Sequence, residues 1–349
     1  MTEKINQLSV SVIVPCRNEE KYIGQLLDNI LEQDYPRPLM EVFVVDGQST
    51  DKTPSIIKGY CEKHSFIHFL ENPEKVVPHA LNSAITKSSG EIIIRLDAHA
   101  IYPGHYISQL VEAITKYQCD NVGGIWETIP ANDSCQALAI ALASAHPFGI
   151  GNAHYRIGVK QPREVDTVPF GCFKRELFNK LGLFDEELVR NQDDEFNARI
   201  INSGGKIMLL PDLIIRYFAR DTLTKVSSMF YQYGFFKPLV NLKLGKPATW
   251  RQFAPPFFVL FLSVTFLLAM VNRISLWLFL PALSVYLVTN LVVSWVASMK
   301  QRKSKWCFGW LVISFVVIHF SYGWGYIRGF ATFVIGRKKV SREAITPNR

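Results

Sequence analysis

The sequence lacks the features of a disulfide-stapled or zinc-finger protein. Its six cysteines are scattered without a C-x-x-C pair, so we expect no disulfide framework and no zinc ribbon, and a reducing cytosol suits this scatter. Residues 1–7 have no apolar core of the kind that a signal peptide carries. The first 253 residues are therefore expected to stay in the cytosol.

Charge is scarce as well. Asp, Glu, Lys and Arg make up 19% of the 349 residues, against 48% hydrophobic residues, and this excludes a disordered chain. From residue 254 onward a single acidic residue stands against eleven Lys and Arg, whereas the first 253 residues hold 27 basic and 29 acidic side chains. The net charge of +8 thus comes from the most apolar third, which points to a membrane surface and not to nucleic acid.

Uncharged runs dominate this last third, over residues 254–271, 274–298 and 306–327. A bilayer is crossed by about 20 apolar residues, so we expect three transmembrane helices within residues 254–336. The basic loop before the third run belongs on the cytosolic side. Three crossings put the basic tail, residues 337–349, outside, whereas a break near residues 323–329 returns it to the cytosol. Both arrangements stay open.

The amino-terminal part alternates short apolar runs with helix-length patterns. Helices are expected between four strands, at residues 8–14, 40–46, 66–70 and 91–97. Continuous Val and Ile runs separated by helices indicate a parallel sheet covered on both faces, as in doubly wound, nucleotide-binding folds. We therefore assign residues 1–220 to one α/β domain.

A helix is also expected between this domain and the membrane region. Residues 222–244 carry aromatic side chains on one side and lysines elsewhere. The pattern is typical of an amphipathic helix at a membrane interface, and equally of a helix that faces a protein core. We assign residues 221–253 to an interfacial helix and linker.

Polar side chains follow the apolar strands. Asp46 ends the second strand and Asp97 the fourth, and ligands of parallel sheets bind beyond the carboxyl ends of the strands. The pattern therefore predicts two carboxylates at one edge, although a helix N-cap explains either aspartate equally well by itself. A Gln-Asp-Asp-Glu run over 192–195 opens an expected helix, and such a run alone is usually a solvated helix start.

In their order, these clusters resemble the family 2 glycosyltransferases, whose catalytic domain has the GT-A fold. The resemblance spans about residues 9–235 and lies in SVIVPCRNEEKYI, VVDGQSTDKT, GEIIIRLDAHA and VPFGCFKRELFNKLGLFDEELVRNQDDEFNARI. The chain is similar in particular to the membrane-anchored, succinoglycan-biosynthesis type of bacterial exopolysaccharide transferase, through LDAHA, HPFGIGNAHYR and the NQD-x-E run. The resemblance implies a GT-A domain, a Rossmann-like mostly parallel sheet with helices on both faces, followed by an α-helical transmembrane region.

The resemblance also implies roles in donor binding. Pro15, Arg17 and Glu19 would border the nucleoside pocket, and Asp46 would accept a hydrogen bond from a uracil ring. Asp97 would bind the donor through its diphosphate.

For the metal, Asp97 and His99 stand where the family places the acids of its D-x-D motif. A divalent cation bridging two phosphates neutralises the leaving group without moving a proton. Carboxylate and imidazole together suit Mn²⁺ better than Mg²⁺, and both remain candidates. Arg95 either assists these phosphates or forms a structural ion pair.

Asp193 matches the general base of the family, with Gln192 in place of the usual Glu. A base without a nucleophile predicts a single displacement with inversion, because it needs only to take the proton of the acceptor hydroxyl. The neighbouring Asp194 and Glu195 are expected to raise the pKa of Asp193 by like-charge repulsion.

Two further segments bear on the acceptor. His146 and His154 lie in a Gly/His-rich loop that faces donor sugar and acceptor in this family, although loop histidines are more often structural. Where processive synthases carry Q-x-x-R-W, this chain has Phe235-Phe236 in place of R-W, which favours addition of one sugar per encounter.

The sequence as a whole predicts an inverting, metal-dependent glycosyltransferase of exopolysaccharide or cell-surface glycan synthesis. Its donor would be a nucleotide sugar, which the family pattern implies to be UDP-linked, and its acceptor a lipid-linked saccharide at the cytosolic face of the bacterial inner membrane. Two alternatives stay open. A polyprenyl-phosphate sugar transferase would need no hydroxyl-deprotonating base, and a membrane-anchored nucleotide-binding subunit would have no activity.

Overall fold

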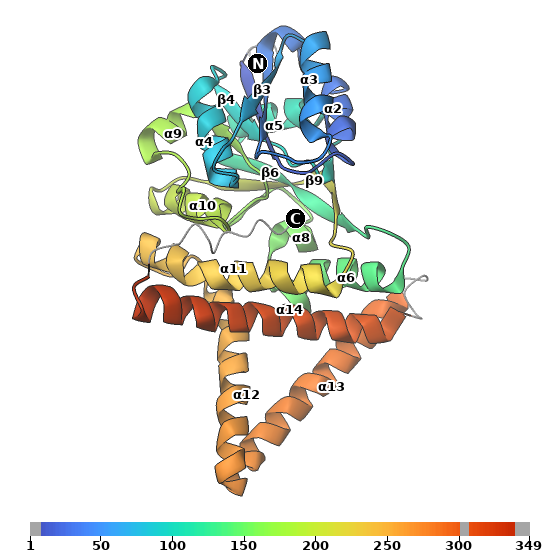
Figure 1. Ribbon diagram of the computed structural model, residues 1–349, viewed down its shortest axis with the longest axis vertical. Coiled ribbons are helices and arrows are strands. Elements are labelled where there is room, and N and C mark those ends of the chain that lie inside the picture. The colour runs from blue at the N-terminus through green and yellow to red at the C-terminus, as the bar shows by residue number, and fades with distance from the viewer. Residues whose placement is uncertain (1–7, 301–306, 339–349) are drawn as a thin grey trace.

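The computed structural model describes residues 8–300 and 307–338. An α/β domain forms one end of the molecule, two helices lie side by side beneath it, and a helical hairpin projects away from both (Figure 1). The basic loop over 301–306, and the tail from 339 onward, lie outside the described residues.

Within the described residues, nine strands form one sheet in the order β3-β2-β1-β4-β8-β6-β9-β5, with β7 paired to β9. Its first half is parallel, because β1 (Val10–Cys16) lies between β2 (Met40–Asp46) and β4 (Ile92–Arg95), and β2 pairs with β3 (Ile67–Glu71). These strands are the predicted apolar runs, and their carboxyl ends meet at one edge.

The second half of the sheet is mixed. β8 (Cys172–Lys174) is antiparallel to both β4 and β6 (Asn121–Ile129), whereas β6 runs parallel to β9 (Ile207–Phe218). Two short strands, β5 (Ala100–Ile101) and β7 (Arg163–Glu164), pair with β9 in antiparallel fashion. The sheet is therefore parallel where the sequence has its longest Val and Ile runs, and mixed beyond them.

Helices cover both faces of this sheet, as predicted. Val12 and Val14 of β1 belong to a core with the first helix α2 (Ile23–Leu31) and with α5 (Tyr106–Lys116), whereas Ile13 packs in a second core with α4 (Val77–Lys87). Because side chains alternate along a strand, one apolar run fills two cores. The helix α3 (Thr53–Lys63) packs beside α2.

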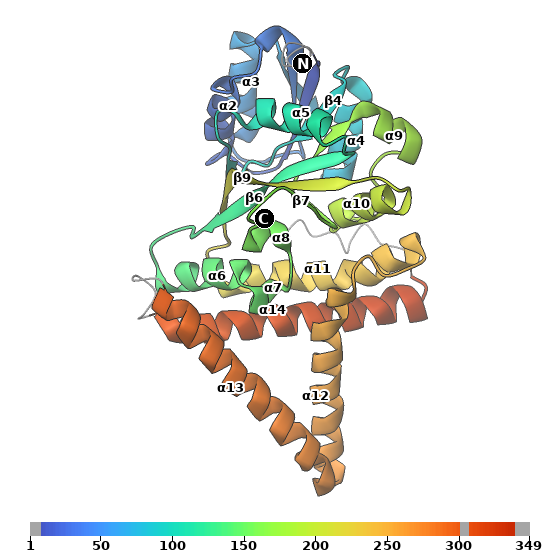
Figure 2. The same cartoon turned by 180° about the vertical axis from the view of Figure 1, so that it is seen from behind.

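Five shorter helices follow in the chain before α11, namely α6 (Cys135–Ala145), α7 (Pro147–Ile150), α8 (His154–Ile157), α9 (Arg175–Leu181) and α10 (Gln192–Asn202). A disulfide joins Cys135 to Cys307, which directly precedes α14, and the other four cysteines form no disulfide among the described residues. This bridge corrects the expectation of fully reduced cysteines. Local spacing did not reveal it because 172 residues separate the pair, which meets where α6 packs on α14 (Figure 2).

Two long helices lie side by side beneath the α/β domain. α11 (Leu223–Leu244) and α14 (Phe308–Gly329) run in the same direction, with Ser227 Oγ 2.8 Å from Ser321 Oγ. Glycines allow the close approach, because a Cβ on Gly325 would overlap the carbonyl oxygen of Tyr231. α11 also contacts α10 on its other side. It therefore faces protein on two sides, which supports the core-facing alternative for much of its surface.

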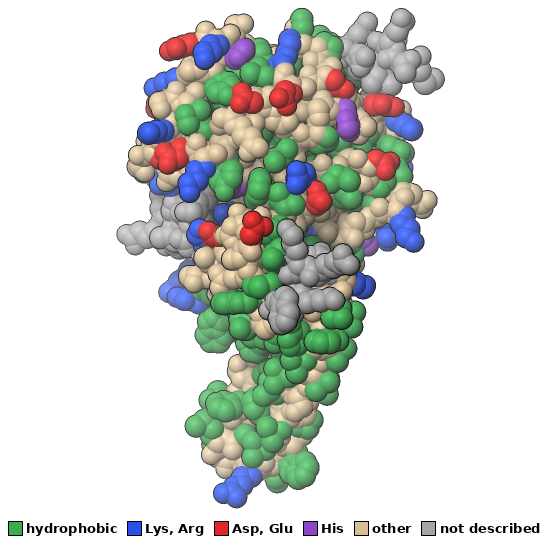
Figure 3. All heavy atoms as spheres, turned by 90° about the vertical axis from the view of Figure 1, so that its right-hand side faces the viewer, with side chains coloured by type: hydrophobic (Ala, Val, Ile, Leu, Met, Phe, Trp, Pro, Cys, Tyr) green, Lys and Arg blue, Asp and Glu red, His purple; other side chains and the backbone are tan. Residues whose placement is uncertain are grey.

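Three helices among the described residues are long and apolar enough to cross a membrane: Trp250–Val271, Arg273–Lys300 and Phe308–Ile335. The first two contain α12 (Ala254–Val271) and α13 (Leu276–Lys300), which form the projecting hairpin, covered by hydrophobic side chains (Figure 3). The third contains α14, which crosses above the hairpin beside α11 (Figures 1 and 2). Hydropathy predicted the length of α14, but it did not predict that α14 runs across the hairpin of α12 and α13.

Candidate functional site

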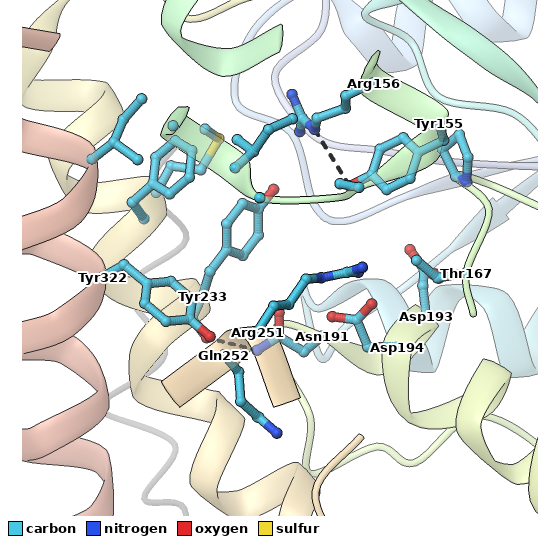
Figure 4. A pocket seen from close by; sticks show the side chains of 18 of the residues that line it. Tyr155, Arg156, Thr167, Asn191, Asp193, Asp194, Tyr233, Arg251, Gln252 and Tyr322 are labelled. Atoms are coloured by element: carbon cyan, nitrogen blue, oxygen red, sulfur yellow. Dashed lines mark hydrogen bonds between the residues drawn. The ribbon is translucent and has the colours of Figure 1, made fainter. Parts of the chain in front are cut away.

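A cavity of about 620 Å³ lies where the α/β domain meets the helices below it. Asp97 and Asp193 line it from the α/β domain, whereas Phe258, Tyr286 and Tyr322 line it from α12, α13 and α14. Figure 4 looks into this space, with Asp193 and Asp194 on one side and Tyr322 on the other. Both parts of the molecule are needed to form the cavity.

Asp193 lies in the first turn of α10, where the helix N-terminus favours a carboxylate. The helix start is fixed by Asn191, which adopts a left-handed backbone (φ 63°) and donates its side-chain N–H to the Tyr233 carbonyl of α11 at 2.8 Å. One third of the Asp193 side chain, 33%, is exposed, and it lines the cavity. α10 therefore presents the predicted base to the space where substrate would lie.

Arg95 is the partner of Asp193. Its Nη1 lies 2.5 Å from Asp193 Oδ1, and the Arg95 side chain is buried. Of the two roles left open for Arg95, the ion pair is the one observed. Burial raises the pKa of Asp193, Arg95 opposes the rise, and the charges of Asp194 and Asp97 add to it. The predicted direction is thus right, with burial as the largest cause.

The other members of the Gln-Asp-Asp-Glu run point to separate partners. Asp194 pairs with Lys237 of α11, with Oδ2 2.5 Å from Nζ. Burial alone would raise the pKa of Asp194, but Lys237 and then Arg251 outweigh it, so the pKa falls below its ordinary value. Glu195 pairs with Arg199 one turn later in α10, with Oε1 2.8 Å from Nε. The run is therefore a set of paired side chains and not a solvated helix start.

Asp97 follows β4 and lines the same cavity. Its side chain is buried, and its Oδ1 accepts the backbone N–H of His99 at 3.1 Å. The His99 imidazole contacts Glu19 and Tyr22: its Nε2 lies 3.0 Å from Glu19 Oε1, and its ring meets Tyr22 edge to face. Asp97 and His99 both line the cavity, and their sharing of a cation stays a prediction.

The donor set bears on the metal. No group of three or more His, Cys, Asp or Glu within the described residues could hold an ion. Asp97 alone fits a cation that takes its remaining ligands from substrate phosphates and water, as Mg²⁺ often does. The choice between Mn²⁺ and Mg²⁺ stays open, although the imidazole on which the preference for Mn²⁺ rested contacts Glu19.

The residues predicted to hold the nucleoside lie along the sheet edge, outside the cavity lining. Pro15 pairs with Val45 across β1 and β2, and Glu19 is buried beneath His99. Arg17 lies against Gly47, and its Nε and Nη1 are buried with no hydrogen-bond partner among the described residues. A buried guanidinium without a partner marks a place for an anion or a carbonyl-rich ligand.

Asp46 ends β2 at the same edge and holds its own loop. Its two carboxylate oxygens accept the Ser49 backbone N–H at 2.9 Å and the Ser49 hydroxyl at 2.5 Å. Asp46 and Asp97 therefore reach one edge of the sheet, as predicted, but only Asp97 lines the cavity. The contact between His99 and Glu19 links the two groups of predicted residues.

The Gly/His-rich segment lines the cavity through residues other than its histidines. Its histidines do not line the cavity; His146 instead accepts the Phe148 backbone N–H on Nδ1 at 3.1 Å. Phe148 and Arg156 do line it, and the Phe148 carbonyl lies 2.6 Å from Nε2 of His319 on α14. The segment is thus part of the cavity wall between the sheet and the long apolar helices.

Sequence reasoning missed Arg156, which is 8% exposed. Its guanidinium lies 4.6 Å from the centre of the Trp126 ring, and its Nη1 donates to the Ser144 carbonyl at 3.3 Å. Lys237 was missed as well, one residue after the position where R-W was sought. Nothing in the local pattern distinguished either residue from an ordinary surface cation.

The sequence matches the model for Glycosyl transferase family 2 over residues 11–182. It is 30% identical over 242 residues to the dolichyl N-acetyl-alpha-D-glucosaminyl phosphate 3-beta-D-2,3-diacetamido-2,3-dideoxy-beta-D-glucuronosyltransferase of Methanococcus voltae, covering 67% of this chain and 74% of that protein. It is 26% identical over 235 residues to the succinoglycan biosynthesis protein ExoA of Rhizobium meliloti, covering 67% and 70%.

Solved structures share the fold. A mannosyltransferase from Pyrobaculum calidifontis, in complex with GDP-Man and Mn²⁺, superposes with a TM-score of 0.57 at 22% identity, covering 91% of this chain and 87% of that chain. TarS of S. aureus gives a TM-score of 0.51 at 22% identity, covering 68% of this chain and 39% of that longer chain. The predicted GT-A architecture is thereby confirmed.

Proposed function

Because this chain belongs to glycosyl transferase family 2, we propose that it transfers a sugar from a nucleotide donor to a lipid-linked saccharide, with inversion. One observation carries the proposal: Asp97 and Asp193 share a cavity whose far wall is made of apolar helices. A soluble acceptor needs no such wall, whereas a lipid-linked one does.

Asp193 is the proposed general base. Its raised pKa makes it a stronger proton acceptor, and Arg95 holds one of its oxygens. As Asp193 takes the proton of the acceptor hydroxyl, that oxygen attacks the anomeric carbon and the nucleoside diphosphate leaves from the opposite face. An α-linked donor therefore gives a β-linked product.

The donor is proposed to lie along the sheet edge toward Asp97. Arg17, Pro15, Glu19 and Asp46 would surround the nucleoside, and the unpartnered nitrogens of Arg17 support this placement. A UDP donor suits the family pattern at Asp46. Asp97 would hold a divalent cation, Mg²⁺ or Mn²⁺, which neutralises the diphosphate as it leaves. His99 would keep Glu19 and the loop beneath it in place.

The hairpin of α12 and α13 is proposed to insert into the inner membrane from the cytosolic side. α11 and α14 would then lie along the membrane surface beneath a cytosolic α/β domain, since both run across the hairpin. Residues 337 and 338, which follow α14, would stay on the side of the α/β domain. This arrangement agrees with the positive-inside rule without a third crossing.

Transfer assays test the function directly. Membranes with the full chain are incubated with radiolabelled nucleotide sugars and a bacterial lipid extract, and the lipid product is analysed for its anomeric configuration. We expect label in a lipid-linked saccharide with inverted configuration. Label in a bare polyprenyl-phosphate sugar would instead support the alternative without a base, and the absence of transfer from every donor would leave the inactive-subunit alternative.

A further inference from the structure

The cavity carries more positive charge than its own acids neutralise. Six cations line it against three aspartates, namely Arg95, Arg156, Arg190, Arg220, Lys237 and Arg251 against Asp97, Asp193 and Asp194. Arg95 and Lys237 pair with two of the aspartates, and Arg251 pairs with Asp166 at 2.9 Å. An enclosed site with surplus positive charge favours an anionic ligand.

Arg156 is the most buried of the cations outside these pairs. No carboxylate lies within ion-pair distance of it among the described residues, and its guanidinium rests on Trp126, which itself stacks on Tyr217 at 4.1 Å. A buried charge is costly without a partner of opposite sign. Stacking and carbonyl contacts hold this guanidinium in place, ready to bind an anion in the cavity.

Arg220, two residues after the end of β9, is a second such cation. It lines the cavity, is half-buried, and forms no ion pair among the residues that the structure describes. Its charge acts on Tyr217, whose ring centre lies 5.9 Å from the Arg156 guanidinium: burial raises the pKa of Tyr217, and the charges of Arg220 and Arg156 both oppose that rise. Two guanidinium groups beside one tyrosine suit the oxygens of a phosphate or diphosphate.

Arg156 and Arg220 line the same cavity as Asp97, whereas the residues proposed to hold the nucleoside lie outside its lining. Arg156 lies on α8, in the segment whose Phe148 carbonyl contacts His319 of α14. The same cavity continues along apolar side chains of the hairpin and α14, including Phe258, Tyr286 and Ile318. The two arginines and these apolar side chains therefore line one continuous cavity.

We propose that Arg156 and Arg220 bind the phosphate groups of the acceptor, while its isoprenoid chain lies along Phe258, Tyr286 and Ile318 and leaves into the membrane. This assignment rests on the proposed function, because it places a phosphate-linked lipid as the acceptor. It also orients that acceptor, with its saccharide toward Asp193.

Binding of farnesyl diphosphate to the purified full chain in nanodiscs tests the assignment without turnover. We expect it to bind more tightly than inorganic pyrophosphate or farnesol, since each lacks one half of the ligand. Losing a hydrogen bond to a charged group costs roughly a tenfold or greater loss of affinity, which we expect for Arg156→Gln, with a smaller loss for Arg220→Gln. The matched control is Arg216→Gln, on the exposed part of β9, which should change nothing.

Binding of UDP separates the outcomes. We expect Arg156→Gln and Arg220→Gln to bind UDP as the wild type does, which also shows that they are folded. Unchanged farnesyl diphosphate affinity in both variants, or a loss confined to UDP, would overturn the assignment. If Arg156→Gln fails to fold, Arg220→Gln tests the assignment by the same two binding measurements, because Arg220 is only half-buried. Failure of the proposed function would appear in the transfer assay and not in these binding measurements, because the wild type would then transfer no sugar even if it binds farnesyl diphosphate.

Discussion

Arg95 and Asp193 lie 98 residues apart in the sequence, and their side chains meet at 2.5 Å on the cavity wall. Arg95 is the last residue of β4, and Asp193 is the second residue of α10. The contact ties the sheet edge, where the donor is proposed to bind, to the helix that presents the base. It also opposes the pKa rise that burial imposes on Asp193.

The pH dependence of transfer should change when Arg95 is replaced. A base acts only when deprotonated, so activity falls as the pH drops through the pKa of Asp193. Arg95→Gln removes the charge that opposes the rise in this pKa, and we expect the acid limb of kcat/KM to move to higher pH. Arg95→Lys keeps a positive charge and should move it less. An acid limb at the same pH in all three proteins would contradict the assignment of that limb to Asp193.

Divalent cations should be needed for transfer, through Asp97. We expect a chelator to abolish transfer and added Mg²⁺ or Mn²⁺ to restore it. UDP binding should tighten when the cation is added to the wild type, and this tightening should be lost in Asp97→Asn. In His99→Asn it should persist, because the His99 imidazole contacts Glu19. Full transfer in the presence of chelator would remove the metal from the account.

The partly buried pair of Lys237 and Asp194 should stabilise the packing of α11 on α10. Removing one partner of a fully buried ion pair costs about 3 kcal/mol or more, and an exposed pair contributes about 1 kcal/mol or less, so Lys237→Met should destabilise the fold by an amount between these limits and lower the unfolding temperature. The Asp194→Leu change added to it should recover part of the loss. Lys225→Met is the matched control on the same helix, because the pair of Lys225 with Asp221 is largely exposed and contributes about 1 kcal/mol at most. Equal effects of the two lysine variants would contradict this prediction.

Close packing of α14 on α11 should depend on Gly325. A Cβ at this position would overlap the Tyr231 carbonyl oxygen, so Gly325→Ala should destabilise by about 1–3 kcal/mol in thermal unfolding. Gly309 lies in the same helix with nothing within 4 Å of its Cβ position. Gly309→Ala should therefore be neutral or slightly stabilising. Equal tolerance at both glycines would mean that the two helices do not pack as described.

The sheet could be predicted well because its physics is local. Buried parallel strands need apolar side chains on both faces, and the runs at β1 and β2 therefore stand out in the sequence. The placement of Asp46 and Asp97 at one edge follows from the same rule. Asp193 was found through the ordered motifs, since a run of acids at a helix start carries little information alone.

What could not be predicted depends on contacts between distant segments. The sequence gives no sign that Cys135 meets Cys307, that Arg156 lies on Trp126, or that His99 turns to Glu19. The direction of α14 is of the same kind. Its composition satisfies the requirements of a membrane crossing, but its glycines match the backbone of α11, and that match appears only when both helices are seen together.

The central claim is that Asp193 removes the proton of the acceptor in this cavity. Its most direct test compares transfer and UDP binding in Asp193→Asn with the wild type and with Asp212→Asn, a change on the exposed part of β9. General bases contribute roughly 100-fold to 10,000-fold to rates, so we expect transfer to fall by at least about 100-fold in Asp193→Asn, with UDP affinity retained and Asp212→Asn unaffected. Transfer at the wild-type rate by Asp193→Asn would contradict the account.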